Sequence, residues 1–136
     1  MTSDALHERF RAVPVVRWLG AELRTAEPGR VEVHLPIRPE FLQADGLVQG
    51  GVLAALADLA AAFLHMPSLQ QGESIVGTSA SLQFLAAVSP TSGPLLASAT
   101  PLRTGRTVVV AVVEVVQDGA LVAHGTFPFL RRRARP

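Results

Sequence analysis

A long apolar segment that contains a single charged side chain most constrains the fold of this chain. It runs from Gln49 through a glycine pair to Phe63, and its one charge is Asp58. At about 100° per residue, the large apolar side chains gather on one side of a helix, and Asp58 lies opposite them. The side chains around Asp58 on that second face are Ala54, Ala55, Ala61, Ala62 and His65. Because both faces are apolar, we predict a central helix that is buried all round.

Asp58 is the first candidate for chemistry. All positions three and four residues away from it are alanine, so no Lys or Arg can neutralise it along the helix. An ionised carboxylate that is buried without partners costs several kcal/mol, and its pKa usually rises above about 3.9. A raised pKa suits a general base or nucleophile near neutral pH.

The glycine pair points to the same segment. Without a Cβ, the backbone at Gly50 and Gly51 can turn tightly and present free N–H groups at a helix N-terminus. Such donors, supported by the helix dipole, stabilise an oxyanion. Taken singly, a glycine pair before a helix is common, and an Asp in a helix is more often solvated or a structural hydrogen-bonder. Their combination on so apolar a helix favours a functional site.

Length and composition narrow the class of protein. The chain has 136 residues and no cysteine, which predicts one domain without disulfides or thiolate metal sites. No metal-ligand spacing or cofactor motif is present, so we expect neither a metal nor a cofactor. The N-terminus lacks a signal peptide and no run approaches a membrane span. We therefore expect a soluble, cytoplasmic protein that binds no membrane.

The charge is concentrated at the C-terminus. Four of the twelve basic residues lie in the Arg-rich segment 131–136, and the rest of the chain carries 8 basic against 11 acidic residues, a net charge of −3. A groove for nucleic acid is therefore not expected. We predict a single domain over residues 1–130, followed by a solvated, frayed Arg-rich tail over 131–136.

Hydrophobic periodicity predicts an α+β fold. A short helix over 4–13, ended by Pro14, precedes two strands; after the long helix the chain is almost wholly β. The strands are expected near 20–25, 31–37, 74–88, 94–103, 106–117 and 120–131, and the run from Val108 to Val116 is expected to be covered on both faces. Short turns such as Asp118-Gly119 make neighbouring strands antiparallel. One curved sheet around one helix leaves edges, so pairing with a second copy is expected.

Three motifs carry a resemblance to a known family. The chain reads Gln43-Ala44-Asp45-Gly46-Leu47-Val48-Gln49-Gly50-Gly51, then Asp58 after six residues; later come Ser81-Leu82-Gln83-Phe84-Leu85, then Thr104-Gly105-Arg106 and Gln117-Asp118-Gly119-Ala120-Leu121-Val122-Ala123. Their order and spacing resemble the hotdog-fold acyl-CoA thioesterases of the phenylacetic-acid-degradation (PaaI) and 4-hydroxybenzoyl-CoA thioesterase group over nearly the full length.

The resemblance implies a fold, an assembly and residue roles. It implies a helix wrapped by a curved antiparallel sheet, in a homodimer with active sites at the subunit interface that often assembles to a homotetramer. It also implies that Asp58 attacks the thioester or activates water, and that the Gly51 N–H polarises the thioester carbonyl. Two helpers differ: the family's His is Gln49 and its Asn is Gln43. An amide can polarise a carbonyl but carries no proton at neutral pH.

Further candidates complete the expected site. Beside Asp58, Gly51 and Gln49 as catalytic residues, the candidates for substrate binding are Gln43, Gly50, Thr78, Ser79 and Arg106. The hydroxyls of Thr78 and Ser79 either hold water or are ordinary strand polarity, and Arg106 is either solvated or bound to coenzyme A phosphate. His65 is expected to be a helix-end histidine that the C-terminal dipole favours. The family's Arg-Pro is Ala86-Ala87, which removes one expected phosphate or pantetheine contact.

Three functions follow from this reading. The first is hydrolysis of an acyl-CoA with an aromatic or medium-chain acyl group. The second is a hotdog module that binds an acyl-CoA or acyl thioester without hydrolysing it, since Gln43 and Gln49 replace the usual helpers. A third function, that of a hotdog dehydratase, is less well supported, because the dehydratase families use a His together with a carboxylate from the partner chain, and this loop contains no His.

Overall fold

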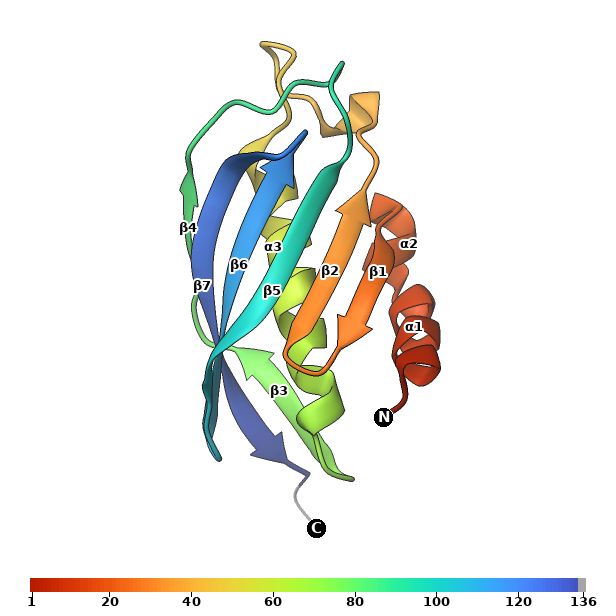
Figure 1. Ribbon diagram of the computed structural model, residues 1–136, viewed down its shortest axis with the longest axis vertical. Helices are drawn as coiled ribbons and strands as arrows, with labels where there is room; N and C mark the ends of the chain where they lie inside the picture. Colours follow the sequence, from red (N-terminus) through yellow and green to blue (C-terminus); the bar gives the residue numbers. More distant parts are fainter. Residues whose placement is uncertain (135–136) are drawn as a thin grey trace.

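One long helix lies against a curved antiparallel sheet in the computed structural model, which describes residues 1–134 (Figure 1). The helix is α3 (Gly50–His65), and the sheet has seven strands in the order β1-β2-β5-β6-β7-β3, with β4 also paired to β7. The strands are β1 (Glu22–Glu27), β2 (Arg30–Leu35), β3 (Glu73–Gly77), β4 (Ser81–Phe84), β5 (Leu95–Thr104), β6 (Val108–Gln117) and β7 (Ala120–Arg133). This arrangement confirms the predicted α+β class.

Two short helices and two 3-10 turns complete the chain. Helices α1 (Ser3–Ala12) and α2 (Pro14–Leu19) lie beside β1, and the turns η1 (Pro39–Phe41) and η2 (Met66–Ser68) flank α3 in sequence (Figure 1). The expected first helix is correct, but the segment after it is helical and not extended. Pro14 ends α1 and also begins α2, because its missing N–H costs nothing at the first position of a helix.

The turns between strands follow their sequences. Asp118 and Gly119 both have positive φ, 49° and 76°, as a two-residue type I′ hairpin between β6 and β7 requires. This confirms the hairpin predicted from Asp-Gly. The expected strand over 74–88 is instead two short strands, because β3 pairs with residues from Phe129 to Arg133 of β7 and β4 pairs with Ala123 to Thr126.

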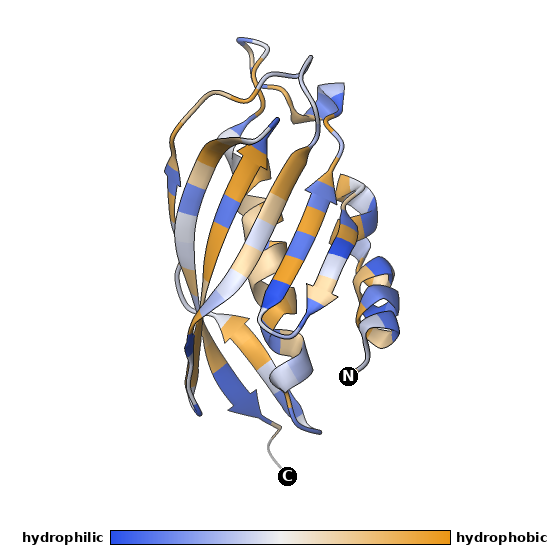
Figure 2. Cartoon of the chain, in the orientation of Figure 1, coloured by the Kyte–Doolittle hydropathy of each residue, from blue (hydrophilic) through white to orange (hydrophobic). Residues whose placement is uncertain are grey.

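The core forms where one face of α3 meets the inner face of the sheet. Hydropathy alternates along the strands (Figure 2). Val109, Ala111, Val113 and Val115 of β6 are fully buried, whereas Glu114 between them is exposed. Small residues in the central strands let α3 approach closely. At one end the ring of Phe63 packs edge-on against Phe10 of α1, with 4.8 Å between the ring centroids.

Two expectations about burial are wrong. The α3 helix is not buried all round: Gly51 and Asp58 are exposed and Ala54, Ala55 and Ala62 are half-buried, because the sheet covers only the opposite side. Similarly, the outer face of β6 is half-buried at best, since no second layer covers it in the single chain. By length and hydropathy Gly50–Ser68 could cross a membrane, but half of it is buried inside the fold.

The expected Arg-rich tail is also wrong over most of its length. Arg131, Arg132 and Arg133 are the last residues of β7, where they pair in register with Ile75, Ser74 and Glu73 of β3. The strand continues because Arg131 is held by partners on three other segments. Arg135 and Pro136 lie outside the described residues.

Candidate functional site

The start of α3 presents backbone donors without acceptors. Gln49 is the residue before the first helical turn, and its carbonyl accepts the Val52 N–H at 3.0 Å. Within residues 1–134, the N–H groups of Gly50 and Gly51 have no hydrogen-bond acceptor. Free N–H groups at a helix N-terminus carry the positive end of the helix dipole. The free N–H groups at the start of the helix are as predicted, and their role as an oxyanion donor stays a prediction.

The two glycines have different surroundings. A Cβ on Gly50 would lie 3.1 Å from Cζ of Phe84, which is closer than ordinary van der Waals contact. A Cβ on Gly51 would meet no atom within 4 Å, and Gly51 is exposed. Gly50 is therefore needed to make room for the ring of Phe84, whereas no atom of the chain crowds the Cα of Gly51.

Asp58 is exposed and unpaired in the single chain. It has no hydrogen bond or ion pair with any of the residues that the structure describes. Its carboxylate keeps contact with solvent, yet the apolar atoms around it raise its pKa above the usual value of an aspartate. The direction agrees with the sequence prediction, although the helix is not buried on this side.

The carboxylate and the donors lie apart along the same helix. Asp58 follows Gly51 by seven residues, which places it on the same side of α3 about 10 Å further along the axis. A group that attacks a carbonyl must approach to about 3–3.5 Å while the carbonyl oxygen bonds the donor. One chain therefore does not bring both groups around one reacting carbon.

The two glutamines lie close to the donor end. Gln43 begins a tight turn in which its carbonyl accepts the Gly46 N–H at 2.9 Å, and both Gln43 and Gln49 are exposed. Beside them is a hollow of about 430 Å³. Its lining includes Gln43, Gly50, Leu53 and Phe84.

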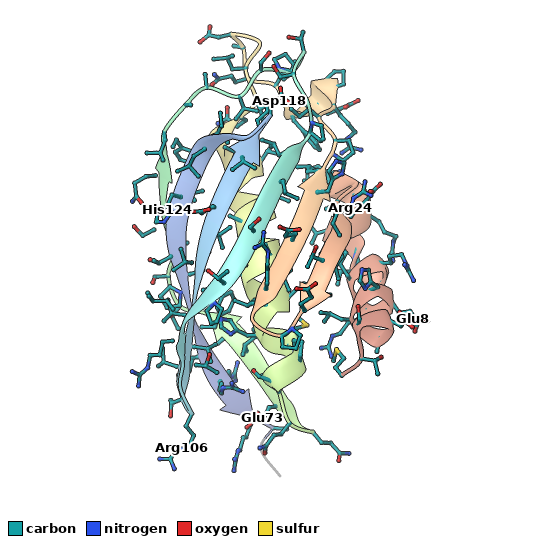
Figure 3. All side chains as sticks on the ribbon, viewed as in Figure 1. Glu8, Arg24, Glu73, Arg106, Asp118 and His124 are labelled. Carbon is teal, nitrogen blue, oxygen red and sulfur yellow. The ribbon has the colours of Figure 1, made fainter. Side chains whose placement is uncertain are left out.

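The other expected substrate contacts are not gathered here. Thr78 and Ser79 lie exposed between β3 and β4, where the Thr78 hydroxyl donates to the Pro128 carbonyl at 3.3 Å. Arg106 lies at the tip of the β5–β6 turn, at the end of the molecule away from the start of α3 (Figures 1 and 3). A substrate contact from Arg106 would have to reach the donors along the length of the molecule or come from a second copy.

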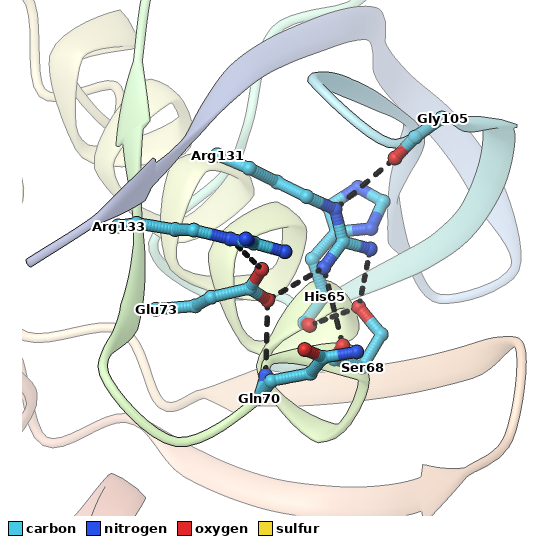
Figure 4. Close-up of polar contacts among 7 residues, drawn as sticks. All are labelled: His65, Ser68, Gln70, Glu73, Gly105, Arg131 and Arg133. Carbon is cyan, nitrogen blue, oxygen red and sulfur yellow. Dashed lines mark hydrogen bonds and ion pairs between the residues drawn. The ribbon is translucent and has the colours of Figure 1, made fainter.

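A partly buried polar cluster at the far end of α3 escaped prediction (Figure 4). Arg131 donates to the Gly105 carbonyl at 3.1 Å and to the carbonyl and hydroxyl of Ser68 at 3.1 and 2.9 Å. It also faces Glu73 at 3.6 Å. Only the run of apolar residues before Arg131 signals that the strand continues.

His65 is not the cationic helix-end residue that the sequence predicted. Its side chain is buried, and burial together with the nearby Arg131 charge lowers its pKa to about 4. His65 is therefore neutral at physiological pH. It packs edge-on against Phe129, with 5.9 Å between the ring centroids, and serves as a core residue.

Comparisons with known proteins decide the family. The family model for the thioesterase superfamily matches residues 45–123, which include the donor loop and Asp58. The chain belongs to the thioesterase superfamily. A Mycobacterium tuberculosis protein with a provisional esterase assignment is 32% identical over 128 residues, covering 91% of this chain and 90% of that protein.

Solved thioesterase structures confirm the hotdog fold. A provisionally assigned thioesterase from Ralstonia eutropha, related to phenylacetic acid degradation, has a TM-score of 0.83 at 33% identity, covering 92% of this chain and 98% of that one. The thioesterase HI1161 of Haemophilus influenzae has a TM-score of 0.89 at 23% identity, covering 100% of this chain and 94% of that one. At this identity the similarity shows the fold alone. This hotdog protein therefore belongs among hydrolases of the thioesterase type, which act generally on thioesters.

Proposed function

We propose that the protein hydrolyses acyl-CoA thioesters with an aromatic or medium-chain acyl group. The observation that carries the proposal is the open N–H of Gly51 at the start of a helix whose only carboxylate, Asp58, is unpaired. A thioester carbonyl needs one donor for its developing negative charge and one base or nucleophile, and its thiolate leaves easily.

The reaction follows from these groups. The carbonyl oxygen of the thioester accepts the Gly51 N–H, and the exposed amide of Gln49 supplies a second donor. Asp58 removes a proton from water as the water oxygen attacks the carbonyl carbon, or Asp58 attacks that carbon itself and forms a mixed anhydride that water then hydrolyses to the acid and free Asp58. The carbon–sulfur bond then breaks and coenzyme A leaves as the thiolate. Because Gln49 cannot carry a proton, Asp58 is the only titrating group of this scheme.

We further propose that each active site is shared by two copies. The separation of about 10 Å between Gly51 and Asp58 in one chain excludes attack by the same chain's carboxylate on a carbonyl bound at Gly51. In a two-fold dimer with α3 antiparallel to its partner, Gly51 of one copy faces Asp58 of the other. The exposed, alanine-lined face of α3 favours such close approach. A homodimer that assembles further to a homotetramer, in the cytoplasm, fits this arrangement.

An acyl-CoA panel tests the activity. Purified protein is assayed with benzoyl-, phenylacetyl-, hexanoyl- and decanoyl-CoA for release of thiol, beside Asp58→Asn. We expect hydrolysis that falls by at least 100-fold in the variant. No thiol release by the wild type over hours would overturn the proposal, and equal rates for both forms would remove Asp58 from the mechanism.

Mixed oligomers test the shared site. Asp58→Asn and Gly51→Val are each expected to be inactive, the first because it removes the carboxylate and the second because a branched side chain at position 51 obstructs the approach of a carbonyl to the adjacent N–H. Unfolded and refolded together, they form mixed dimers in which one of two shared sites has both intact groups. Activity must then reappear. Its absence, with mixed dimers demonstrated by mass spectrometry, would show that each site uses one chain.

The amides at Gln43 and Gln49 favour a second candidate, a module that binds acyl-CoA without turnover. Both side chains can hold a thioester in place without moving a proton. Calorimetry that detects tight binding of the same acyl-CoAs, with no thiol released, would favour this function over hydrolysis.

A further inference from the structure

We propose that Phe84 determines acyl-group specificity, as the wall against which an aromatic acyl group lies beside Gly51. This inference rests on the proposed thioesterase function and assigns a residue and a substrate class to it. Phe84 is the last residue of β4, where its backbone pairs with Ala123 of β7. The sheet therefore fixes the position from which its ring projects.

The ring of Phe84 is placed against the donor turn. Three of its carbons lie within 3.6 Å of the position that a Cβ on Gly50 would occupy. The ring thus covers Gly50 and lies next to Gly51, the residue whose free N–H is the proposed oxyanion donor. The absence of a side chain at Gly50 is what lets an aromatic ring lie this close to the donor.

The rest of the ring is free. Phe84 is 56% exposed, although phenylalanine is among the residues most often buried. Burying apolar surface contributes about 25 cal/mol per Å², and the exposed part of the Phe84 ring lacks this stabilisation. A flat apolar group placed on Phe84 would recover that burial and gain an aromatic contact as well.

The hollow that Phe84 lines suits an uncharged group. Apart from Gln43 its side chains are apolar, among them Leu47, Leu53, Phe84 and Leu85, and backbone groups supply the rest of its polar surface. Its volume of about 430 Å³ lies within the range of small-ligand pockets. Ala86 and Ala87 leave it without a cation for a phosphate group. The acyl part of a thioester fits this lining better than the charged end of coenzyme A does.

Replacement of the ring tests the inference. Phe84→Leu keeps an apolar side chain but removes the flat face, and it is assayed with phenylacetyl-CoA and hexanoyl-CoA. The ratio of the two kcat/KM values should fall about five-fold, mainly through KM for the aromatic substrate. A defect in folding or dimerisation lowers kcat/KM for both substrates by the same factor, so it leaves this ratio unchanged.

Two further variants complete the test. Gly50→Ala pushes the ring away from the donor turn, and it should shift the ratio in the same direction as Phe84→Leu. Trp18→Leu removes a ring that is 69% exposed on α2 and should leave the ratio unchanged. An active wild type whose ratio is the same in Phe84→Leu would overturn the role of Phe84, whereas a wild type inactive on every thioester would overturn the proposed function itself.

Discussion

Replacement of Arg131 by methionine should destabilise the protein markedly, because this side chain joins three segments. Its guanidinium makes three hydrogen bonds, one to the β5–β6 turn at Gly105 and two to Ser68 at the end of α3 (Figure 4). Its side chain is only 12% exposed, so water replaces these bonds poorly. At about 1 kcal/mol each, the three bonds contribute about 3 kcal/mol to the free energy of unfolding.

The expected loss can be read as a shift of the melting temperature. An unfolding entropy of about 2.1 cal/mol/K per residue gives about 0.29 kcal/mol/K for this chain of 136 residues. A loss of about 3 kcal/mol then lowers the melting temperature by about 10 °C. The ion pair with Glu73 adds to the loss, but that carboxylate retains the Gln70 N–H and Arg133 as partners.

Arg132→Met is the matched control for this measurement. Arg132 is the next residue of β7 and is exposed, and its side chain has no hydrogen bond or ion pair with the rest of the described chain. Thermal unfolding followed by circular dichroism should show a change of less than about 2 °C for this variant. If Arg131→Met and Arg132→Met melt at the same temperature, the proposed cross-link does not contribute to stability and the last residues of β7 behave as a frayed end.

Three further perturbations have definite signs. Gly51→Ala should raise the melting temperature slightly, because alanine favours a helix and its Cβ meets no atom of the chain. Its kcat/KM should fall at least ten-fold, because the added methyl group crowds a carbonyl that approaches the neighbouring N–H. Asp58→Asn should raise the free energy of unfolding at pH 7, because the raised pKa of Asp58 means that the folded chain disfavours its charge. In urea titrations this gain should shrink as the pH falls through the raised pKa of wild-type Asp58, and it should vanish below the ordinary value of 3.8. The lowered pKa of His65 has the opposite consequence: wild-type stability should decline from about pH 6.5 towards about pH 4, since only the unfolded chain protonates His65, and His65→Gln should flatten that decline.

The elements that depend on local sequence were predicted well. The start of α3 at the glycine pair and the hairpin at Asp118-Gly119 both follow from backbone conformations that glycine permits. The split between β3 and β4 could not be predicted, because Thr78 and Ser79 suit a strand. It arises from the partner strand: β3 and β4 pair with separate stretches of β7, and the chain between them crosses the gap.

The candidate site was predicted by residue type but not by environment. The helical wheel of α3 places alanines around Asp58. Alanine is tolerated against a sheet, against a second helix and in water, so the wheel does not show which of the three this face meets. Only the position of the sheet reveals that this side is uncovered. Similarly, no local pattern shows that the ring of Phe84 lies on Gly50, because β4 is brought to the start of α3 by its pairing with β7.

The surroundings of Asp58 bear on its proposed role as a base. A carboxylate in a helix can be satisfied by a cap, a cation or a neighbouring strand of its own chain, or by water. Asp58 has none of these partners among the described residues, and its pKa is raised even with solvent in contact. A second copy or an acyl group laid on this face would remove more water, and desolvation would raise the pKa further. In the proposed mechanism, Asp58 would therefore become a stronger base when the site is assembled, which is when a base is needed.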